Sequence, residues 1–195
     1  MKNIIVLTVL LSFFFGHGQK SKLSAEHYQN VRKAFRQKMP DNSVAVLFSA
    51  PIRNRANDVD YIYHQDPNFF YLTGWHQPHS VLMIYKNPQT DSEGVYYEKI
   101  YVPERDDYME MWNGKRYDLE QVKQLGYERV AERLDFKNDC GNLGRFDQVL
   151  MFEFKNDIRN QKTYVFRDNV RFKVDDPHDL FDLKATFREA INFPN

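Results

Sequence analysis

Four charged residues occupy a polar stretch that directly follows an apolar run. The run SVAVLFS covers residues 43–49, and the polar stretch PIRNRANDVD covers residues 51–60. The charged members of that stretch are Arg53, Arg55, Asp58 and Asp60. In open α/β sheets, ligand-binding groups gather just outside the ends of buried strands. The spacing therefore indicates a binding loop, although a solvated loop without a binding role also fits these residues.

A tryptophan in a charged segment is the second candidate for a contact residue. Trp112 belongs to YMEMWNGKR, residues 108–116, and lies two residues before Gly114. A buried Trp is usually found in an apolar run, whereas an exposed Trp offers a large surface to a partner. From these residues alone, core packing and partner contact stay equally open.

Two histidines three residues apart raise the question of a metal site. On a helix, His76 and His79 could bind one ion together. Pro78 between them and Gly74 just before them favour a turn instead. The sequence contains no helical zinc-protease motif, phosphate-binding glycine loop or nucleophile elbow. A self-contained catalytic site is therefore not evident.

Composition favours one folded domain. The 195 residues are 42% hydrophobic and 15% aromatic, which is enough apolar material for a substantial core. The 27 basic and 27 acidic residues are interspersed, so a nucleic-acid partner has no electrostatic support. Cys140 is the single cysteine, so it cannot form an internal disulfide, and an inert thiol is the expected state.

Apolar patterns predict the elements that must position these residues. Helices are expected at residues 25–39, 119–125 and 180–191, capped by Ser24, Asp118 and Asp179, and the second should turn Leu119, Val122 and Leu125 inward. Strands are expected at residues 43–49, 81–85, 95–102 and 148–154, with short ones at 162–166 and 170–174. Buried strands mixed with helices predict a three-layer α/β domain.

The N-terminus has the pattern of a secretory signal. Lys2 precedes an apolar run at residues 4–15, and small residues follow at Gly16 and Gly18. The run is shorter than the roughly 20 residues that span a bilayer. We therefore expect residues 1–18 to be cleaved, leaving Gln19 as the mature N-terminus of a secreted or periplasmic protein with no membrane attachment. An uncleaved anchor is the alternative.

Two motifs together resemble one family. The segment DYIYHQDPNFFYLTGW, residues 60–75, is followed by Pro78 and an apolar strand. The segments YVPERD, residues 101–106, and EMWNGKR, residues 110–116, follow in the family's order and separation. Both resemble the N-terminal domain of Xaa-Pro aminopeptidases (aminopeptidase P), over about residues 24–135. His64 replaces the family's usual Arg, so a contact that needs a guanidinium group is in doubt.

The resemblance implies a fold and a division of labour. It implies the creatinase/prolidase N-terminal-domain fold, a mixed sheet of about six strands with helices on both faces. Residues 19–195 would form this non-catalytic domain. In the family, a C-terminal pita-bread domain holds two manganese ions through Asp, His and Glu ligands, and the 60 residues after residue 135 cannot contain it. No catalytic or metal-binding residue is therefore expected in this chain.

The resemblance also implies roles for four residues. Asp58 matches an acidic residue that approaches the substrate's N-terminal amine, a cation that a carboxylate can pair with. Trp112 matches an aromatic residue that lines the substrate pocket. Arg105 and Arg116 match positions that we assign to salt bridges with another domain or subunit. Homo-oligomers, dimers or tetramers, and Xaa-Pro peptides are the partners implied.

Three interpretations follow. The first is an oligomerisation and substrate-gating domain of an exported manganese-dependent Xaa-Pro aminopeptidase, without turnover of its own. The second is a stand-alone, non-catalytic peptide-binding or interaction module. The third is an independent enzyme or metalloprotein that uses His76 and His79.

Overall fold

The computed structural model describes residues 23–56, 59–152 and 180–191. The helices are α2 (Ala25–Lys38), α3 (Pro67–Thr73), α4 (Asp107–Asn113), α5 (Leu119–Lys123), η1 (Arg133–Asp135), α6 (Phe136–Asp139), η2 (Cys140–Arg145) and α7 (Leu180–Ala190). The strands are β1 (Ser43–Phe48), β2 (Asn54–Ala56), β3 (Val59–Asp60), β4 (Val81–Asp91), β5 (Gly94–Val102), β6 (Arg129–Glu132) and β7 (Gln148–Leu150). The strands predicted at 162–166 and 170–174 lie outside the described residues.

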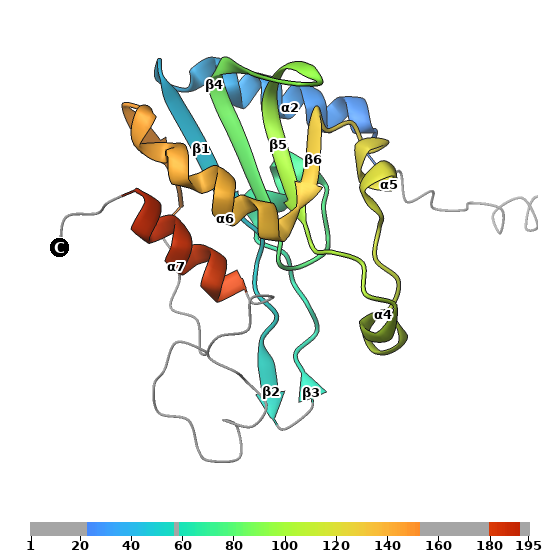
Figure 1. Cartoon of the computed structure of the whole chain (residues 1–195). Coiled ribbons are helices and arrows are strands. Elements are labelled where there is room, and N and C mark those ends of the chain that lie inside the picture. Colours follow the sequence, from blue (N-terminus) through green and yellow to red (C-terminus); the bar gives the residue numbers. More distant parts are fainter. Residues whose placement is uncertain (1–22, 57–58, 153–179, 192–195) are drawn as a thin grey trace, which may run out of the picture.

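Five strands form one mixed sheet in the order β6-β5-β4-β1-β7. The central strands β1, β4 and β5 pair antiparallel, and β6 and β7 add in parallel at the two edges. Figure 1 shows α2 on one face of this sheet and α6 and α7 on the other. The three-layer α/β fold predicted from the sequence is confirmed, with five strands in the described sheet against about six expected.

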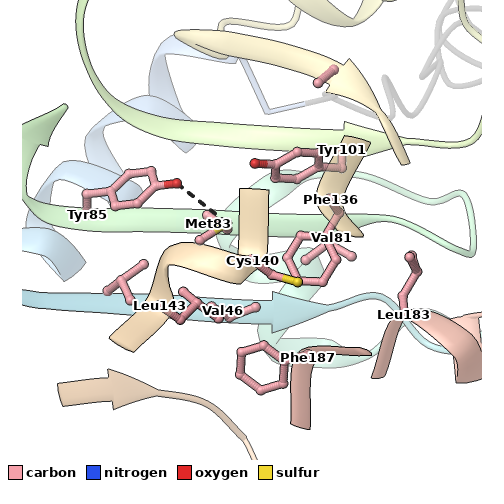
Figure 2. Close-up of a cluster of buried hydrophobic side chains, with 12 residues drawn as sticks. Val46, Val81, Met83, Tyr85, Tyr101, Phe136, Cys140, Leu143, Leu183 and Phe187 are labelled. Carbon is pink, nitrogen blue, oxygen red and sulfur yellow. Dashed lines mark hydrogen bonds between the residues drawn. The ribbon is translucent and has the colours of Figure 1, made fainter. Parts of the chain in front are cut away.

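Alternation along the strands divides the core into two clusters. Val44 and Val46 of β1 belong to the cluster covered by α6 and α7, while Ala45 and Leu47 belong to the cluster on the α2 face. Figure 2 shows the first cluster, where Phe136 of α6 and Phe187 of α7 pack over the sheet. A strand covered on both faces has no polar side, so these strands appear in the sequence as continuous apolar runs.

A buried ion pair lies on the α2 face. The Nε atom of Arg32 lies 2.7 Å from Oε2 of Glu98, and the Arg32 side chain is fully excluded from solvent. The same guanidinium group donates to the carbonyl oxygens of Leu72, at 3.2 Å, and Gly126, at 2.8 Å, and it stacks over the ring of Tyr127. One side chain therefore connects α2, β5, α3 and the turn after α5.

The aromatic stretch at residues 66–75 contains a short helix, α3, which the apolar pattern did not predict. Asp66 caps α3 by accepting hydrogen bonds from the backbone N–H groups of Asn68 and Phe69, and Pro67 occupies the first turn. Gly74 ends the helix with a φ of 65°, a conformation that favours glycine. Phe69 and Leu72 are buried, whereas Tyr71 of the same helix is exposed.

Other expectations were wrong in detail. The stretch 51–60, expected as a loop, contains the antiparallel ribbon β2–β3. Strand β4 continues to Asp91, past the expected stop near residue 86, with an irregular register between Ile84 and Gln89. Leu119 and Leu125 of the α5 region are exposed, because the short helix buries only Val122. Helix α4 and strand β6 were not predicted.

Across the described residues, we find no helix with the length and apolar character that spanning a membrane requires.

Gly74→Ala should destabilise the fold. A Cβ atom at this position would lie 2.4 Å from Cε2 of Tyr28. We expect the left-handed backbone to cost about 1–2 kcal/mol and the steric overlap about 1–3 kcal/mol more. Urea unfolding measures the loss. Gly144→Ala is the control, because nothing lies within 4 Å of the added Cβ. Equal stability of the two variants would contradict the prediction.

Arg32→Met should also destabilise the protein, because it leaves the Glu98 carboxylate buried without its ion-pair partner. Removing one member of a buried ion pair typically costs about 3–5 kcal/mol. Arg32→Met combined with Glu98→Leu should lose less than the sum of the two single variants, since the double change removes both charges. A double-mutant cycle in urea provides this comparison, and additive losses would show that the two side chains are not coupled.

Candidate functional site at one end of the sheet

The sheet topology gathers three connections at one end. Because β4 is antiparallel to both β1 and β5, the chain leaves β1 and β5 at the end where it enters β4. The ribbon β2–β3 follows β1, residues 75–80 precede β4, and α4 follows β5. In Figure 1 the ribbon and α4 both project from this end, away from the β4–β5 turn.

Ion pairs hold the α4 segment in shape. Arg105 donates from Nε to Oε1 of Glu110, at 3.1 Å, and from Nη2 to Oε2, at 3.3 Å. Arg105 also lies 3.4 Å from a carboxylate oxygen of Asp107. The backbone N–H of Arg116 donates to the same Glu110 carboxylate, at 3.2 Å. Glu110 thus ties the start of the segment to the residues that follow α4.

Glu104 connects this segment to the body of the domain. Its Oε2 atom accepts from Nη2 of Arg133 at 2.8 Å, and its Oε1 atom accepts from the backbone N–H of Leu134 at 2.9 Å. Its carbonyl oxygen accepts from Nη1 of Arg116 at 2.9 Å. The Arg133 side chain is buried, so this link is anchored in η1 at the edge of the sheet.

The electrostatics favour the ionised form of the pair. The hydrogen bond from Arg105 is the main cause that lowers the pKa of Glu110, and the backbone N–H of Arg116 adds to it. The same pairing raises the pKa of Arg105. Both groups are therefore charged at neutral pH, and their chemistry is that of a structural ion pair.

The resemblance assigns roles to Asp58, Arg105, Trp112 and Arg116, and the structure describes the side chains of Arg105 and Arg116. Asp58 lies outside the described residues, between β2 and β3. Trp112 belongs to α4, but its side chain is likewise outside the part of the chain that the structure describes. Arg105 and Arg116 both find partners within the chain, through Glu110 and Glu104. Their predicted role in contacts with another domain or subunit stays a prediction.

Sequence reasoning missed the exposed apolar side chains here. Ile62, just after β3, is 83% exposed, and Met111 of α4 is 73% exposed. Tyr61, next to Ile62, and Tyr108, three residues before Met111, are also exposed. Large apolar residues embedded among charges were the available signal, as for Trp112. We call Tyr61, Ile62, Tyr108 and Met111 the apolar arm residues.

The histidine pair lies in a turn. His79 has a φ of 59°, and the ring of His76 packs against Phe70 with 4.4 Å between ring centroids. Among residues 23–56, 59–152 and 180–191, no group of three or more His, Cys, Asp or Glu side chains could hold a metal ion. The described part of the chain therefore provides no ligand set for manganese.

Cys140 lies in the core on the α6 and α7 face (Figure 2). Its thiol donates to the carbonyl oxygen of Lys137 at 3.4 Å. Burial raises the pKa of the thiol to about 11. A thiol with that pKa stays protonated at neutral pH, so it is a weak nucleophile, as the sequence analysis expected.

Comparison with known proteins identifies the class. The family described as "Aminopeptidase P, N-terminal domain" matches residues 28–144. Two solved structures of Escherichia coli aminopeptidase P share the fold. The one with the inhibitor Pro-Leu has a TM-score of 0.59 and 26% identity over 77% of this chain and 32% of that one. A variant in complex with substrate has a TM-score of 0.58 and 28% identity over 66% and 29% of the two chains. The chain belongs to the aminopeptidase P N-terminal domain family.

Curated relatives agree with this assignment. "Intermediate cleaving peptidase 55" of Schizosaccharomyces pombe is 30% identical over 88% of this chain and 39% of its own length. The Xaa-Pro aminopeptidase of Escherichia coli is 32% identical over 56% of this chain and 24% of its own length. Human Xaa-Pro aminopeptidase 3 is 40% identical over 39% of this chain and 15% of its own length. The chain therefore spans well under half the length of these relatives.

Glu110→Gln should loosen α4 without unfolding the domain. Because the pKa of Glu110 is lowered in the folded state, its stabilising effect is present above its unfolded pKa and is lost as the pH falls through the folded pKa. At pH 7 we expect faster amide exchange at Gly114, whose N–H donates to the carbonyl oxygen of Glu110 at 3.0 Å. The difference from wild type should vanish in acid.

Hydrogen exchange compared at matched pH measures this effect. Glu120→Gln is the control, because Glu120 is exposed on α5. A Glu110→Gln variant with wild-type exchange in α4 at pH 7 would show that the ion pair does not hold the segment.

Proposed function

We propose that this chain is the N-terminal, non-catalytic module of an exported Xaa-Pro aminopeptidase. In this role it assembles subunits and forms one wall of the cleft in which a separate catalytic domain binds peptides. The family assignment and the names of the relatives support the enzyme class. The single observation that carries the wall function is the sheet end with two projecting arms, one of them held by ion pairs and both bearing exposed apolar side chains.

The physical character of this end fits a surface that another protein body covers. The charged side chains Arg105, Glu110, Glu104 and Arg133 are engaged in pairs within the chain. The apolar arm residues are exposed, and burying a side chain such as Ile62 contributes about 2 kcal/mol. Association at this end would thus be driven by apolar burial, with the ion pairs fixing the shape of α4.

The site residues take their roles within this proposal. Asp58 pairs with the N-terminal amine of the peptide, and Trp112 offers a flat apolar face to the proline ring. Arg105, whose side chain is half exposed, extends its ion pairs to a neighbouring subunit, as does Arg116. The proposal assigns two manganese ions to the separate catalytic domain. Residues 1–18 would direct export to the periplasm or the exterior and would then be cleaved off.

A hydrolysis assay tests the catalytic part. The purified chain with added manganese should release no N-terminal residue from an Xaa-Pro peptide. Calorimetry with the same peptide tests the alternative of a stand-alone module. Micromolar binding by monomeric chain, abolished by Asp58→Asn, would overturn the wall function in favour of that alternative, and turnover by the homogeneous chain would overturn both.

Sedimentation equilibrium tests the assembly part. We expect the chain to self-associate and Ile62→Ser to weaken association roughly 10- to 30-fold, the loss of about 2 kcal/mol of apolar burial. Val95→Ser is the matched control, because Val95 is 62% exposed but lies at the opposite end of the sheet, beside the β4–β5 turn. A monomeric chain, or equal weakening by both variants, would contradict the assignment of this surface.

A further inference from the structure

One glutamine closes the base of the ribbon arm. Gln65 lies between β3 and α3, where the chain returns to the sheet. Its Oε1 atom accepts from the backbone N–H groups of Ala50, at 2.7 Å, and Asp66, at 2.9 Å. Its Nε2 atom donates to the carbonyl oxygens of Trp75, at 3.1 Å, and Gln77, at 3.2 Å. A single amide therefore binds the chain where it leaves β1, where it enters α3 and where it approaches β4.

Further hydrogen bonds reinforce the same base. The Tyr63 hydroxyl donates to the carbonyl oxygen of Ala50 at 3.2 Å. Ser49 and Ser80 are joined twice, by the Ser49 N–H to the Ser80 carbonyl at 2.9 Å and by the Ser80 N–H to the Ser49 hydroxyl at 2.8 Å. The two ends of the ribbon excursion are thus fixed to each other and to the segment before β4.

Trp75 links this base to the other arm. Its side chain is buried, its carbonyl accepts from Gln65, and its indole N–H donates to the Ser80 hydroxyl at 2.8 Å. Its ring lies 5.6 Å from the ring of Tyr117, centroid to centroid. Tyr117 directly follows Arg116, whose backbone N–H is bound to Glu110 of α4. A continuous set of contacts therefore runs from the ribbon base through Trp75 to the α4 segment.

We propose that Gln65 and Trp75 are positioning residues that fix the ribbon β2–β3 and the α4 segment relative to each other. Neither residue is proposed to touch the peptide. We call these two residues and their contacts the brace. Its use rests on the proposed function, which assigns Asp58, between β2 and β3, and Trp112 of α4 to the peptide. The brace would keep the ribbon and the α4 segment in a fixed arrangement for that role.

The two bonds that Gln65 donates depend on a single atom, Nε2. Gln65→Glu has the same shape, but it replaces the N–H donors with a carboxylate oxygen that faces the carbonyls of Trp75 and Gln77. Those carbonyls then lose their hydrogen bonds, and the oxygen atoms repel one another. Because the rest of the side chain is unchanged, an effect of this variant reports on the two donated bonds.

Amide hydrogen exchange of the full chain, resolved by segment, tests the proposal without depending on assembly or activity. In Gln65→Glu we expect exchange to rise about tenfold or more at Tyr61 and in α4, because the loss of the bonds to Trp75 and Gln77 releases the base of the ribbon from the segment before β4. Exchange at Ile100 in the centre of the sheet should stay at the wild-type rate. Gln124→Glu, at an exposed position after α5, is the control and should change neither arm.

Two substitutions of Trp75 separate positioning from stability. Trp75→Phe keeps an aromatic ring against Tyr117, so exchange in α4 should stay near wild type. Trp75→Leu removes the ring contact, so exchange in α4 should rise about tenfold or more relative to Trp75→Phe. A rise confined to residues 50–66 in Gln65→Glu, or equal α4 exchange in the two Trp75 variants, would overturn the brace. A uniform rise in exchange that includes Ile100 would show that both residues contribute only to the overall stability of the domain.

Discussion

The buried guanidinium group of Arg32 is the constraint around which the α2 face is organised. A charge removed from water must be paired and hydrogen-bonded, and Arg32 meets this need with Glu98 of β5 and with two backbone carbonyls. Those carbonyls belong to Leu72, near the end of α3, and to Gly126, just after α5, where helices leave acceptors without intrahelical partners. One cation thus satisfies two helix ends and fixes α2, α3 and α5 on the sheet, and all of these partners must be in place together.

The residues that carry the family resemblance serve this architecture more than they serve chemistry. In the stretch 60–75, Asp66 caps a helix, Gly74 ends it, and Gln65 binds four backbone groups. Thr73 donates from its hydroxyl to the Phe69 carbonyl, and its own carbonyl accepts from Tyr127, the residue under the Arg32 guanidinium. The motif is therefore a folding unit that joins the buried ion pair to the end of the sheet from which the two arms project.

The sequence predicted what depends on apolar periodicity and missed what depends on tertiary partners. Strands β1 and β5 and helix α2 follow from apolar patterns and from the Ser24 cap. The ribbon β2–β3 has too little alternation to identify it, and Arg32 has the polarity of a solvent-facing residue on an amphipathic helix. The resemblance found the segment with Arg105 and Arg116, but their bonds to Glu110 and Glu104 depend on how the chain folds after β5. Ile62 and Met111 were missed because the exposure of an apolar side chain in a short segment depends on how that segment lies against the rest of the fold.

The distribution of charge at the sheet end decides what kind of surface it is. The hydrogen bond from Arg105 lowers the pKa of Glu110 and holds it in the ionised form. Glu104 is likewise paired with buried Arg133, so these carboxylates fix the shape of the α4 segment. The apolar arm residues then provide the surface that a partner can gain by burying, on a chain whose formal net charge is zero. Because apolar association is non-directional, the placement of these side chains depends on the scaffold, which the ion pairs of α4 and the hydrogen bonds at the base of the ribbon hold together.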